Sequence, residues 1–247
     1  MRYLILLLAF YSPFLHGSAQ NGAMVGAVQI TPENVVNILD RDFKAELVSS
    51  GVSLDPPPNS RGSLFFNDDW SKGFVLMKGN QMAKDVSMRF NSYTNQIFFK
   101  KGDQVLVLDA SVPVIGFGLE GGSDNPGKTT VFLNGYPAIE GRTTVTFYEV
   151  VAYGRLSLLK YHSKKIMEEK DQNRVPIKAV IDTDYWCVYD STTNRMTDIK
   201  HNKNSLLESL PAYAASIRSI LDEKKLKLKS DGEWPVLFDA LNSRQRQ

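Results

Sequence analysis

Residues 73–108 read GFVLMKGNQMAKDVSMRFNSYTNQIFFKKGDQVLVL, and this stretch decides the fold. Four short runs of β-branched, aromatic and aliphatic residues, at 73–77, 86–90, 96–100 and 104–108, alternate with segments that carry Gly, Asn and Asp. Strands that start about ten residues apart with such turns between them are typical of an antiparallel meander. Glycine supplies the positive φ of a tight hairpin, so we expect each strand to pair with the next.

Further strands follow the meander. The pattern predicts them at 114–119, 131–133, 143–153, 156–161, 177–181, 185–189 and 196–199. The run 143–153 is dense in Thr, Val, Phe and Tyr and is apolar on both faces, which predicts a central strand. It should pair with 156–161 across Gly154 and Arg155. Residues 162–172 are polar and charged, and a loop and a short solvated helix both fit them.

Helical patterns occupy the C-terminal end. Ser205 and Glu208 have the spacing of a capping box, Pro211 can begin a new helix, and Asp231 can cap the last one. The apolar positions are Tyr213, Ile217, Ile220 and Leu221 in the first stripe, and Trp234, Val236, Leu237 and Leu241 in the last helix. The sequence therefore predicts a mainly β protein with C-terminal helices (α+β). The antiparallel meander forms an open sheet or partial barrel, packed by those helices.

Four segments divide the chain in this interpretation. Residues 1–19 form a signal peptide, 20–60 an N-terminal helix and a proline-rich linker, 61–200 the antiparallel β domain, and 201–247 the helical segment. The N-terminal helix is expected over residues 32–41. Three prolines at 56–58 can neither donate to a sheet nor continue a helix, so they predict a stiff linker.

The N-terminus has the pattern of a secretory signal peptide. Arg2 gives a short cationic start, residues 3–11 are almost wholly apolar, and small residues at 17–19 precede Gln20. A run of about nine apolar residues cannot anchor the chain, because a membrane helix needs roughly twenty. We therefore expect cleavage between Ala19 and Gln20 and export to the periplasm or the medium, away from cytoplasmic nucleotides.

Composition and the single cysteine narrow the function classes. Lys and Arg number 29 against 27 Asp and Glu, and this balance favours neither nucleic acid nor an anionic membrane as a partner.

Cys187 cannot form an internal disulfide, and its apolar surroundings in the chain predict a buried, inert thiol. Gln20, not a cysteine, follows the predicted cleavage site, so no lipid anchor is expected. After signal removal no run reaches the length of a membrane span.

A set of motifs within residues 64–243 carries a family resemblance. They are LFFNDDW at 64–70, GFVL at 73–76, YTNQIFFK at 93–100, GKT at 127–129, NGYP at 134–137, TFYEV at 146–150, GR at 154–155 and LLK at 158–160. In these motifs the chain resembles a family of uncharacterised secreted or periplasmic proteins of Bacteroidota-type bacteria. The resemblance implies export and a shared fold. The family has no established activity, so it implies no catalytic residue, substrate or cofactor.

Residues 122–129, GSDNPGKT, match the phosphate-binding loop pattern. In that pattern Gly122 and Gly127 shape the loop, Lys128 reaches the outer phosphates, and Thr129 leads into a helix whose positive end faces them. The residues that follow here, TVFLNG at 130–135, are a β-branched and aromatic run that ends in a turn. We therefore interpret the match as a chance one in a surface hairpin loop, and predict no nucleotide cofactor.

Histidines and paired carboxylates give weaker candidates. His162 and His201 each lie in a polar stretch without a ligand-spaced partner, which predicts lone surface histidines and no metal site. Asp68 and Asp69 are neighbours, and adjacent side chains of an extended segment point to opposite faces. Turn capping is therefore the expected role of these two carboxylates.

Asp182 and Asp184 stand two residues apart, as ligands do in calcium loops. The glycine and the later glutamate of such a loop are missing. We interpret residues 182–184 as a turn between two strands.

Two functions remain open. The favoured one is a non-enzymatic binding or interaction protein of the cell envelope, with a protein, lipid or glycan as its partner. The near-neutral charge and the lack of a catalytic constellation motivate it. The alternative is an extracytoplasmic hydrolase with scattered carboxylates, for which Asp68, Asp69, Asp182 and Glu149 are the candidates. That function requires two of them to converge within about 5 to 10 Å.

Overall fold

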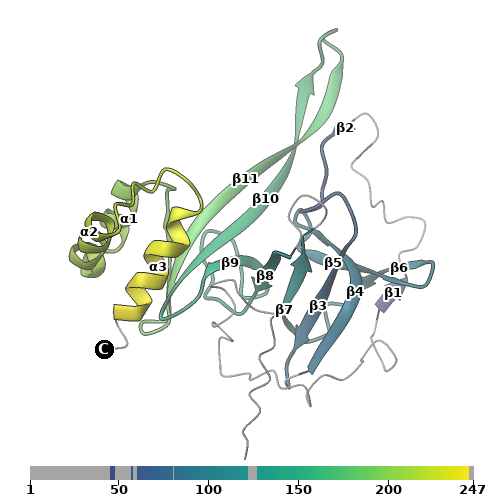
Figure 1. The fold of residues 1–247 in the computed structure, drawn as a ribbon. Helices are drawn as coiled ribbons and strands as arrows, with labels where there is room; N and C mark the ends of the chain where they lie inside the picture. Colours follow the sequence, from purple (N-terminus) through teal and green to yellow (C-terminus); the bar gives the residue numbers. More distant parts are fainter. Residues whose placement is uncertain (1–44, 48–56, 58–59, 80, 122–126, 245–247) are drawn as a thin grey trace, which may run out of the picture.

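The computed structural model describes residues 45–47, 57, 60–79, 81–121 and 127–244, and the fold concerns these residues. The predicted cleavage site at Ala19 and Gln20, the helix over 32–41 and most of the proline-rich linker lie outside them. The strands form one sheet, in the spatial order β1-β6-β5-β4-β3-β7-β8-β9-β10-β11-β12 (Figure 1). The sheet stays open, and helices follow it at the C-terminal end, so the predicted fold class is confirmed.

Most strand pairs are antiparallel, and one short strand pairs in parallel. The strands are β1 (Ala45–Leu47), β2 (Ser60–Arg61), β3 (Ser71–Met77), β4 (Gln81–Asn91), β5 (Gln96–Lys101), β6 (Gln104–Leu108), β7 (Val114–Glu120), β8 (Thr129–Leu133), β9 (Tyr148–Ala152), β10 (Leu156–Lys170), β11 (Pro176–Asp190) and β12 (Arg195–Ile199). The parallel strand is β2, which lies along β11.

The meander of β3 to β6 follows the predicted pattern. Each of these strands pairs antiparallel with the next in the chain. In the turn between β5 and β6, Lys101 pairs with Gln104. Gly102 has a φ of +59° there, a left-handed conformation that glycine adopts at no steric cost. The spacing of turn residues therefore predicts both the strands and their partners.

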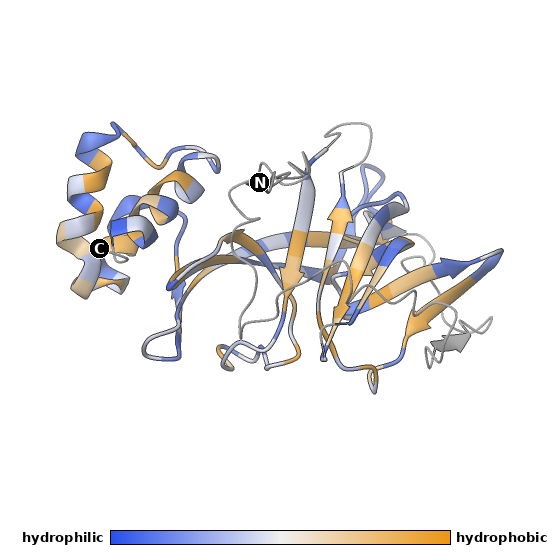
Figure 2. Cartoon of the chain, turned by 60° about the horizontal axis from the view of Figure 1, so that its bottom comes forward, coloured by the Kyte–Doolittle hydropathy of each residue, from blue (hydrophilic) through white to orange (hydrophobic). Residues whose placement is uncertain are grey.

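Both faces of the central sheet are apolar. One face carries a phenylalanine cluster in which the rings of Phe117 and Phe132 stack with centroids 4.7 Å apart. The opposite face carries Tyr148 and Leu159, both fully buried. Figure 2 shows hydrophobic residues along the strands of this part of the sheet. Burial on both faces confirms that β9 is a central strand, with β8 on one side and β10 on the other.

The helices cover one face of β9 to β12 near the end of the sheet (Figure 1). They are α1 (Lys203–Ser209), the 3₁₀ helix η4 (Pro211–Tyr213), α2 (Ala214–Glu223) and α3 (Glu233–Arg244). Asn202, and not Ser205, caps α1, because the Asn202 side chain accepts a hydrogen bond from the Ser205 amide. Val236 is 43 % exposed, and Phe238 packs in the core instead. Among the described residues, no helix has the length and apolar character to cross a membrane.

The predicted strand over 143–153 is wrong in its first half. Residues 143–146 form a turn in which the Thr146 amide donates to the Thr143 carbonyl at 3.0 Å. The Thr143 amide donates to the Thr146 hydroxyl, also at 3.0 Å. Threonine hydroxyls that bond to nearby backbone groups compete with strand pairing, and β propensity alone does not register this competition. Val145, predicted inside the strand, is 66 % exposed.

The largest departure from the prediction concerns residues 162–185. The polar segment 162–172, expected as a loop or short helix, continues β10 to Lys170. The expected turn at 182–184 lies inside β11, where Asp182 pairs with Lys164 and Asp184 with His162. The two strands therefore form one hairpin of fifteen residues a side. Its outer half buries only a few apolar side chains, such as Ile166, Ala179 and Val180, so the segment lacks the regular apolar alternation that identifies a strand.

Candidate functional site

The outer part of the long hairpin is an arm, defined here as residues 161–185. Figure 1 shows its distal end standing clear of both the rest of the sheet and the helices. β9 pairs with β10 only at Leu158, Leu159 and Lys160. Beyond Lys160, the described residues provide β10 with one strand neighbour, β11. The arm is therefore a two-stranded ribbon.

The turn at the tip of the arm is well ordered by hydrogen bonds. Asp171 Oδ1 accepts from the Asn173 amide at 2.9 Å and from the Val175 amide at 2.7 Å. The Asp171 amide donates to the Val175 carbonyl at 2.9 Å. Arg174 takes a φ of +61° between them. These bonds fix the turn through Asp171, and residues 172–176 around it are exposed.

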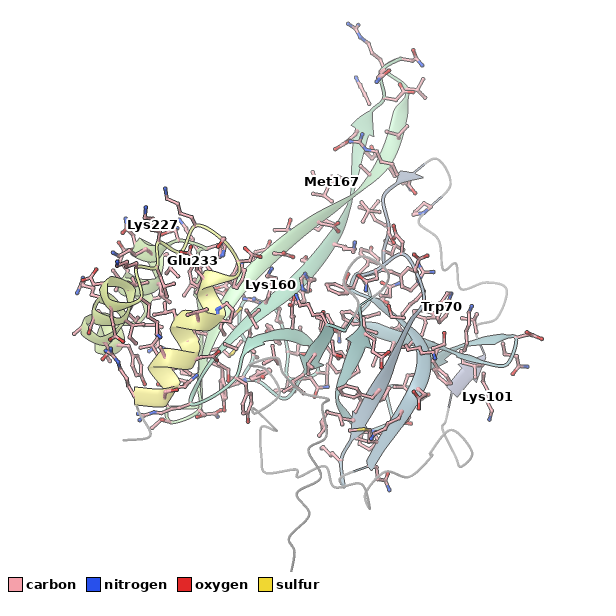
Figure 3. The ribbon with its side chains drawn as sticks, in the orientation of Figure 1. Trp70, Lys101, Lys160, Met167, Lys227 and Glu233 are labelled. Carbon is pink, nitrogen blue, oxygen red and sulfur yellow. The ribbon has the colours of Figure 1, made fainter. Side chains whose placement is uncertain are left out.

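Apolar and cationic side chains share the tip. Val175 in the turn is 53 % exposed, and Met167, three residues before the end of β10, is 54 % exposed. Figure 3 shows Met167 on the arm, away from the helices. Within the described part of the chain, Lys170, Arg174 and Lys178 make no ion pair.

Ion pairs connect side chains along the arm, one near its base and one near its outer end. Lys164 bonds Asp182 across the hairpin at 2.7 Å, and Arg61 of β2 bonds Glu169 at 2.5 Å. Ile166 packs with Val180 against a small apolar cluster of Leu64, Phe65 and Phe98. The arm is thus supported at its base and middle, and its tip extends beyond this support.

His162 lies where the arm joins the sheet, between two carboxylates. Its Nε2 is 2.7 Å from Glu149 Oε2 of β9, and its Nδ1 is 2.8 Å from Asp184 Oδ1 of β11. The ring packs on Phe66 and Phe132, with centroids 4.7 and 6.1 Å away. The side chain is only 14 % exposed, so the expectation of a lone surface histidine is wrong.

The two carboxylates favour the charged form of His162. Burial lowers the pKa of His162, but the hydrogen bonds to Asp184 and Glu149 and the charges of these carboxylates outweigh it. The pKa of His162 therefore lies above its usual 6.5. The hydrogen bond from His162 in turn holds the pKa of Asp184 below its usual 3.8. With both ring nitrogens donating to carboxylates, neither is free to take a proton from a substrate or to bind a metal.

A row of charges continues from His162 toward the helices. Lys160 Nζ lies 3.6 Å from Asp184 Oδ2 and 3.0 Å from Asp231 Oδ2. Asp231 is in the segment just before α3. The same ammonium lies 4.4 Å above the Trp186 ring. Burial lowers the pKa of Lys160, but its hydrogen bond with Asp231 and nearby carboxylates raise it above the usual value. Figure 3 shows Lys160 at the base of the arm, between the sheet and the helices.

His201, expected to be a lone surface histidine, is partly buried and has close neighbours, with its side chain 30 % exposed. Its ring stacks on Trp186 and on Trp234, with centroids 4.4 and 4.7 Å away, and the two tryptophan rings are 5.6 Å from each other. Its Nε2 lies 3.3 Å from Asp231 Oδ1. This cluster of three rings is part of the contact between the sheet and the helices, because Trp186 belongs to β11 and Trp234 to α3.

On the opposite face, Arg142 organises a buried polar cluster. Its guanidinium donates to Cys187 Sγ at 3.1 Å and to the Ile139 carbonyl at 3.2 Å, and it pairs with Asp198. The Cys187 thiol donates to Asp198 Oδ1 at 3.0 Å. Burial, together with this bond, raises the pKa of Cys187 to about 12. The prediction of a buried thiol is confirmed, and the cluster keeps that thiol protonated.

The four carboxylates considered for hydrolysis do not form a site together. Asp68 and Asp69 are exposed in the bend that precedes β3. Glu149 bonds His162, and Asp182 bonds Lys164 on the exposed arm. Among the residues that the structure describes, no three His, Cys, Asp or Glu side chains gather closely enough to hold a metal ion.

The phosphate-loop match lies in a β hairpin. Gly122 falls outside the described residues. Gly127 has a φ of +85° in the turn, Lys128 is exposed, and Thr129 begins β8. The Gly121 amide donates to the Lys128 carbonyl at 2.6 Å and closes the hairpin. A strand, not a helix, follows the loop, so the amides of a helix N-terminus are not available for phosphate.

A shallow hollow of about 420 Å³ lies between α2 and α3, lined by side chains such as Lys224, Val236 and Ser243. Arg244 at its rim already pairs with Glu223. No convergent set of polar groups marks this hollow as a ligand site.

Comparison with known proteins adds no family. No family model, no curated protein and no solved structure matches the chain.

Proposed function

We propose that the protein is an exported, non-enzymatic binding protein of the cell envelope, and that the tip of its arm docks on a partner protein. The observation that supports this proposal is the exposed apolar residue Val175 at the end of a projecting hairpin. An exposed apolar side chain at the extremity of a projecting hairpin is accessible to a partner, and a partner can bury it as an anchor.

Binding of a partner would lower the free energy of such an arm by burying its exposed apolar side chain. A two-stranded hairpin without a third layer is only marginally stable in water. Here ion pairs and a small apolar cluster support the middle of the arm, while the tip carries Val175 without cover. A partner that buries Val175 would remove apolar area from water, at about 25 cal/mol for each Å².

The unpaired cations indicate the character of the partner surface. Lys170, Arg174 and Lys178 surround Val175 in the chain, and among the described residues none of the three has a carboxylate partner. Charged groups around an apolar anchor set specificity and association rate more than affinity. We therefore infer a protein partner with an apolar depression rimmed by acidic residues.

Export is the second part of the proposal. It is supported by the apolar run 3–11 and the small residues before Gln20. Fractionation of cells that express the full chain, followed by N-terminal sequencing, tests it. The expected result is a periplasmic or secreted protein that begins at Gln20 and carries no lipid. Retention in the cytoplasm with residues 1–19 intact would overturn this part.

Photo-crosslinking tests the arm. A benzophenone amino acid placed at Val175 should yield one dominant adduct with an envelope protein. The matched control is the same amino acid at Val145, which is 66 % exposed but lies in the turn before β9. Adducts of equal yield and pattern at the two positions, or no adduct at Val175, would contradict a partner site at the tip.

Charge reversal at the tip gives an independent check. Arg174→Glu should lower the crosslinking yield at Val175 by about tenfold, because it places an anion against the acidic rim. Lys84→Glu is the control, since Lys84 is an exposed lysine of β4, outside the arm. Equal yields from both variants would exclude an acidic partner surface.

A further inference from the structure

One edge of the arm is open along most of its length. β11 is covered on its outer side by β2 at Lys178 and Ala179 and by β12 from Trp186 onward. On the outer side of β10, the described residues provide no strand neighbour after Lys160. The backbone from Tyr161 to Glu169 therefore presents a row of donors and acceptors to solvent.

An open edge of this kind accepts another strand. Strand addition at an edge draws affinity from backbone hydrogen bonds and specificity from the side chains that become neighbours. The arm already shows this behaviour on its other edge, where β2 comes from outside the hairpin and pairs with β11. The question is which strand the β10 edge fits.

The sequence of β10 is complementary to itself. Residues 164–169 read KKIMEE, two cations, two apolar residues and two anions. An antiparallel copy of the same segment reverses this order. When the two-fold axis passes through Met167, Lys165 comes to face Glu169 and Ile166 comes to face Glu168. Cross-strand pairs of opposite charge stabilise the pairing of two strands, and like charges directly opposite destabilise it.

Side-chain alternation selects the register. In a two-fold symmetric antiparallel pair, directly opposite residues must point to the same face of the sheet, so the axis passes through a residue. With the axis at Met167, each Met167 faces its counterpart, and Lys165 faces Glu169 of the second copy in two equivalent pairs. Lys164 faces Lys170 of the second copy, and Asp182 already neutralises Lys164 at 2.7 Å.

This register uses groups that the single chain leaves without partners. Met167 is 54 % exposed, and in the pair it packs on its counterpart. Lys165 makes no ion pair within the described part of the chain, and in the pair it gains a carboxylate. Glu169 bonds Arg61, and a carboxylate has acceptor capacity for a second cation.

We propose that two copies of this chain associate through antiparallel pairing of their β10 edges, centred on Met167. The occupant of the edge is thus a second copy, and the pairing extends the two hairpins into one four-stranded sheet. This inference goes beyond the proposed function. The two share Lys170, whereas Val175 and Arg174 carry only the proposed function.

Disulfide trapping in the purified mature protein tests the proposal. Met167→Cys places two thiols directly opposite each other, with Cβ atoms about 4.5 to 5.5 Å apart, and a small local shift of the strands brings them within disulfide distance. Val175→Cys is the matched control, since the exposed fractions of Met167 and Val175 are 54 % and 53 %. Cys187 is fully buried and does not compete. Under mild oxidation the covalent dimer should form at Met167→Cys about tenfold faster or more than at Val175→Cys.

Sedimentation equilibrium of variants without new cysteines gives the second measurement. Met167→Arg places two like charges at the axis and should leave the protein monomeric at concentrations at which the wild type dimerises, with an unchanged circular dichroism spectrum. Equal trapping rates at positions 167 and 175, or a wild type that stays monomeric throughout, would overturn the proposal. Neither result would affect crosslinking of a foreign partner at Val175.

Discussion

The side chain of Asn242 on α3 hydrogen-bonds both backbone groups of Leu156, the first residue of β10. Its Oδ1 accepts from the Leu156 amide at 2.9 Å, and its Nδ2 donates to the Leu156 carbonyl, also at 2.9 Å. Gly154 lies against the side-chain amide of Asn242. A Cβ atom at position 154 would come within 2.3 Å of this side-chain amide. Helix α3 is thus hydrogen-bonded to the first residue of the β10–β11 hairpin, whose outer part is the arm.

Asn242→Ala should therefore destabilise the fold by about 2–4 kcal/mol, because it leaves two buried backbone groups without partners. Chemical denaturation followed by tryptophan fluorescence measures the change, since Trp234 is on the same helix. Ser243→Ala is the control, an exposed neighbour on α3. A loss below 0.5 kcal/mol for Asn242→Ala, comparable to the control, would contradict this role.

Arg142→Lys should also be costly although it keeps the charge. The guanidinium reaches Cys187, Asp198 and the Ile139 carbonyl at once. A lysine ammonium lacks the planar fork that makes such simultaneous bonds. We expect a loss of about 2–4 kcal/mol in unfolding free energy, measured by urea denaturation. Arg195→Lys, at an exposed position, should change it by less than 0.5 kcal/mol, and equal effects of both would count against the cluster.

Cys187 should resist alkylation in the folded protein. It is fully buried, and its pKa is raised to about 12, so very little thiolate exists at pH 8. Iodoacetamide should modify it at least about a hundredfold more slowly in the native state than in denaturant, as read by mass spectrometry. It is the one cysteine of the chain, so the mass shift is unambiguous. Similar rates in both states would show that the thiol is accessible.

The parts of the fold that the sequence predicts are those with local causes. Turns such as Gly102 and alternating apolar residues place β3 to β6 correctly, because tight turns and burial leave direct marks in the chain. Pro211 and the stripe at Ile217, Ile220 and Leu221 likewise predict the helical segment. Residues 182–184 look like a turn because aspartate is rare in strands, yet on a solvated arm it has no burial cost.

The sequence does not predict that His162 lies between Glu149 and Asp184, and the reason is different. Glu149 and Asp184 are 13 and 22 residues away from His162, and strand pairing alone brings them to its ring. A signal was nevertheless present. Asp171 and Asn173 are turn-forming residues, and a hairpin assumed at this turn places His162 opposite Asp184. Glu149 requires the register of β9 on β10, which includes a bulge that no local pattern predicts.

His162→Gln gives the prediction that depends on pH. The folded pKa of His162 is above 6.5, so its charged bonds stabilise the fold fully below pH 6.5, and this contribution is lost as the pH rises through the raised folded value. The pKa of Asp184 is below 3.8, so its contribution is present above pH 3.8 and is lost as the pH falls through the lowered folded value. The stabilising window therefore spans pH 3.8 to 6.5.

In this window the variant should be less stable than wild type by about 2–4 kcal/mol, as for a hydrogen-bonded charge that loses its partner. Above the folded pKa of His162 the difference should fall to about 1 kcal/mol, the worth of a neutral hydrogen bond. Urea denaturation from pH 5 to pH 9 measures it, with Lys84→Gln, at an exposed position of β4 outside the arm, as the control without a pH trend. A difference that stays constant or grows with pH would mean that His162 is neutral between its two carboxylates.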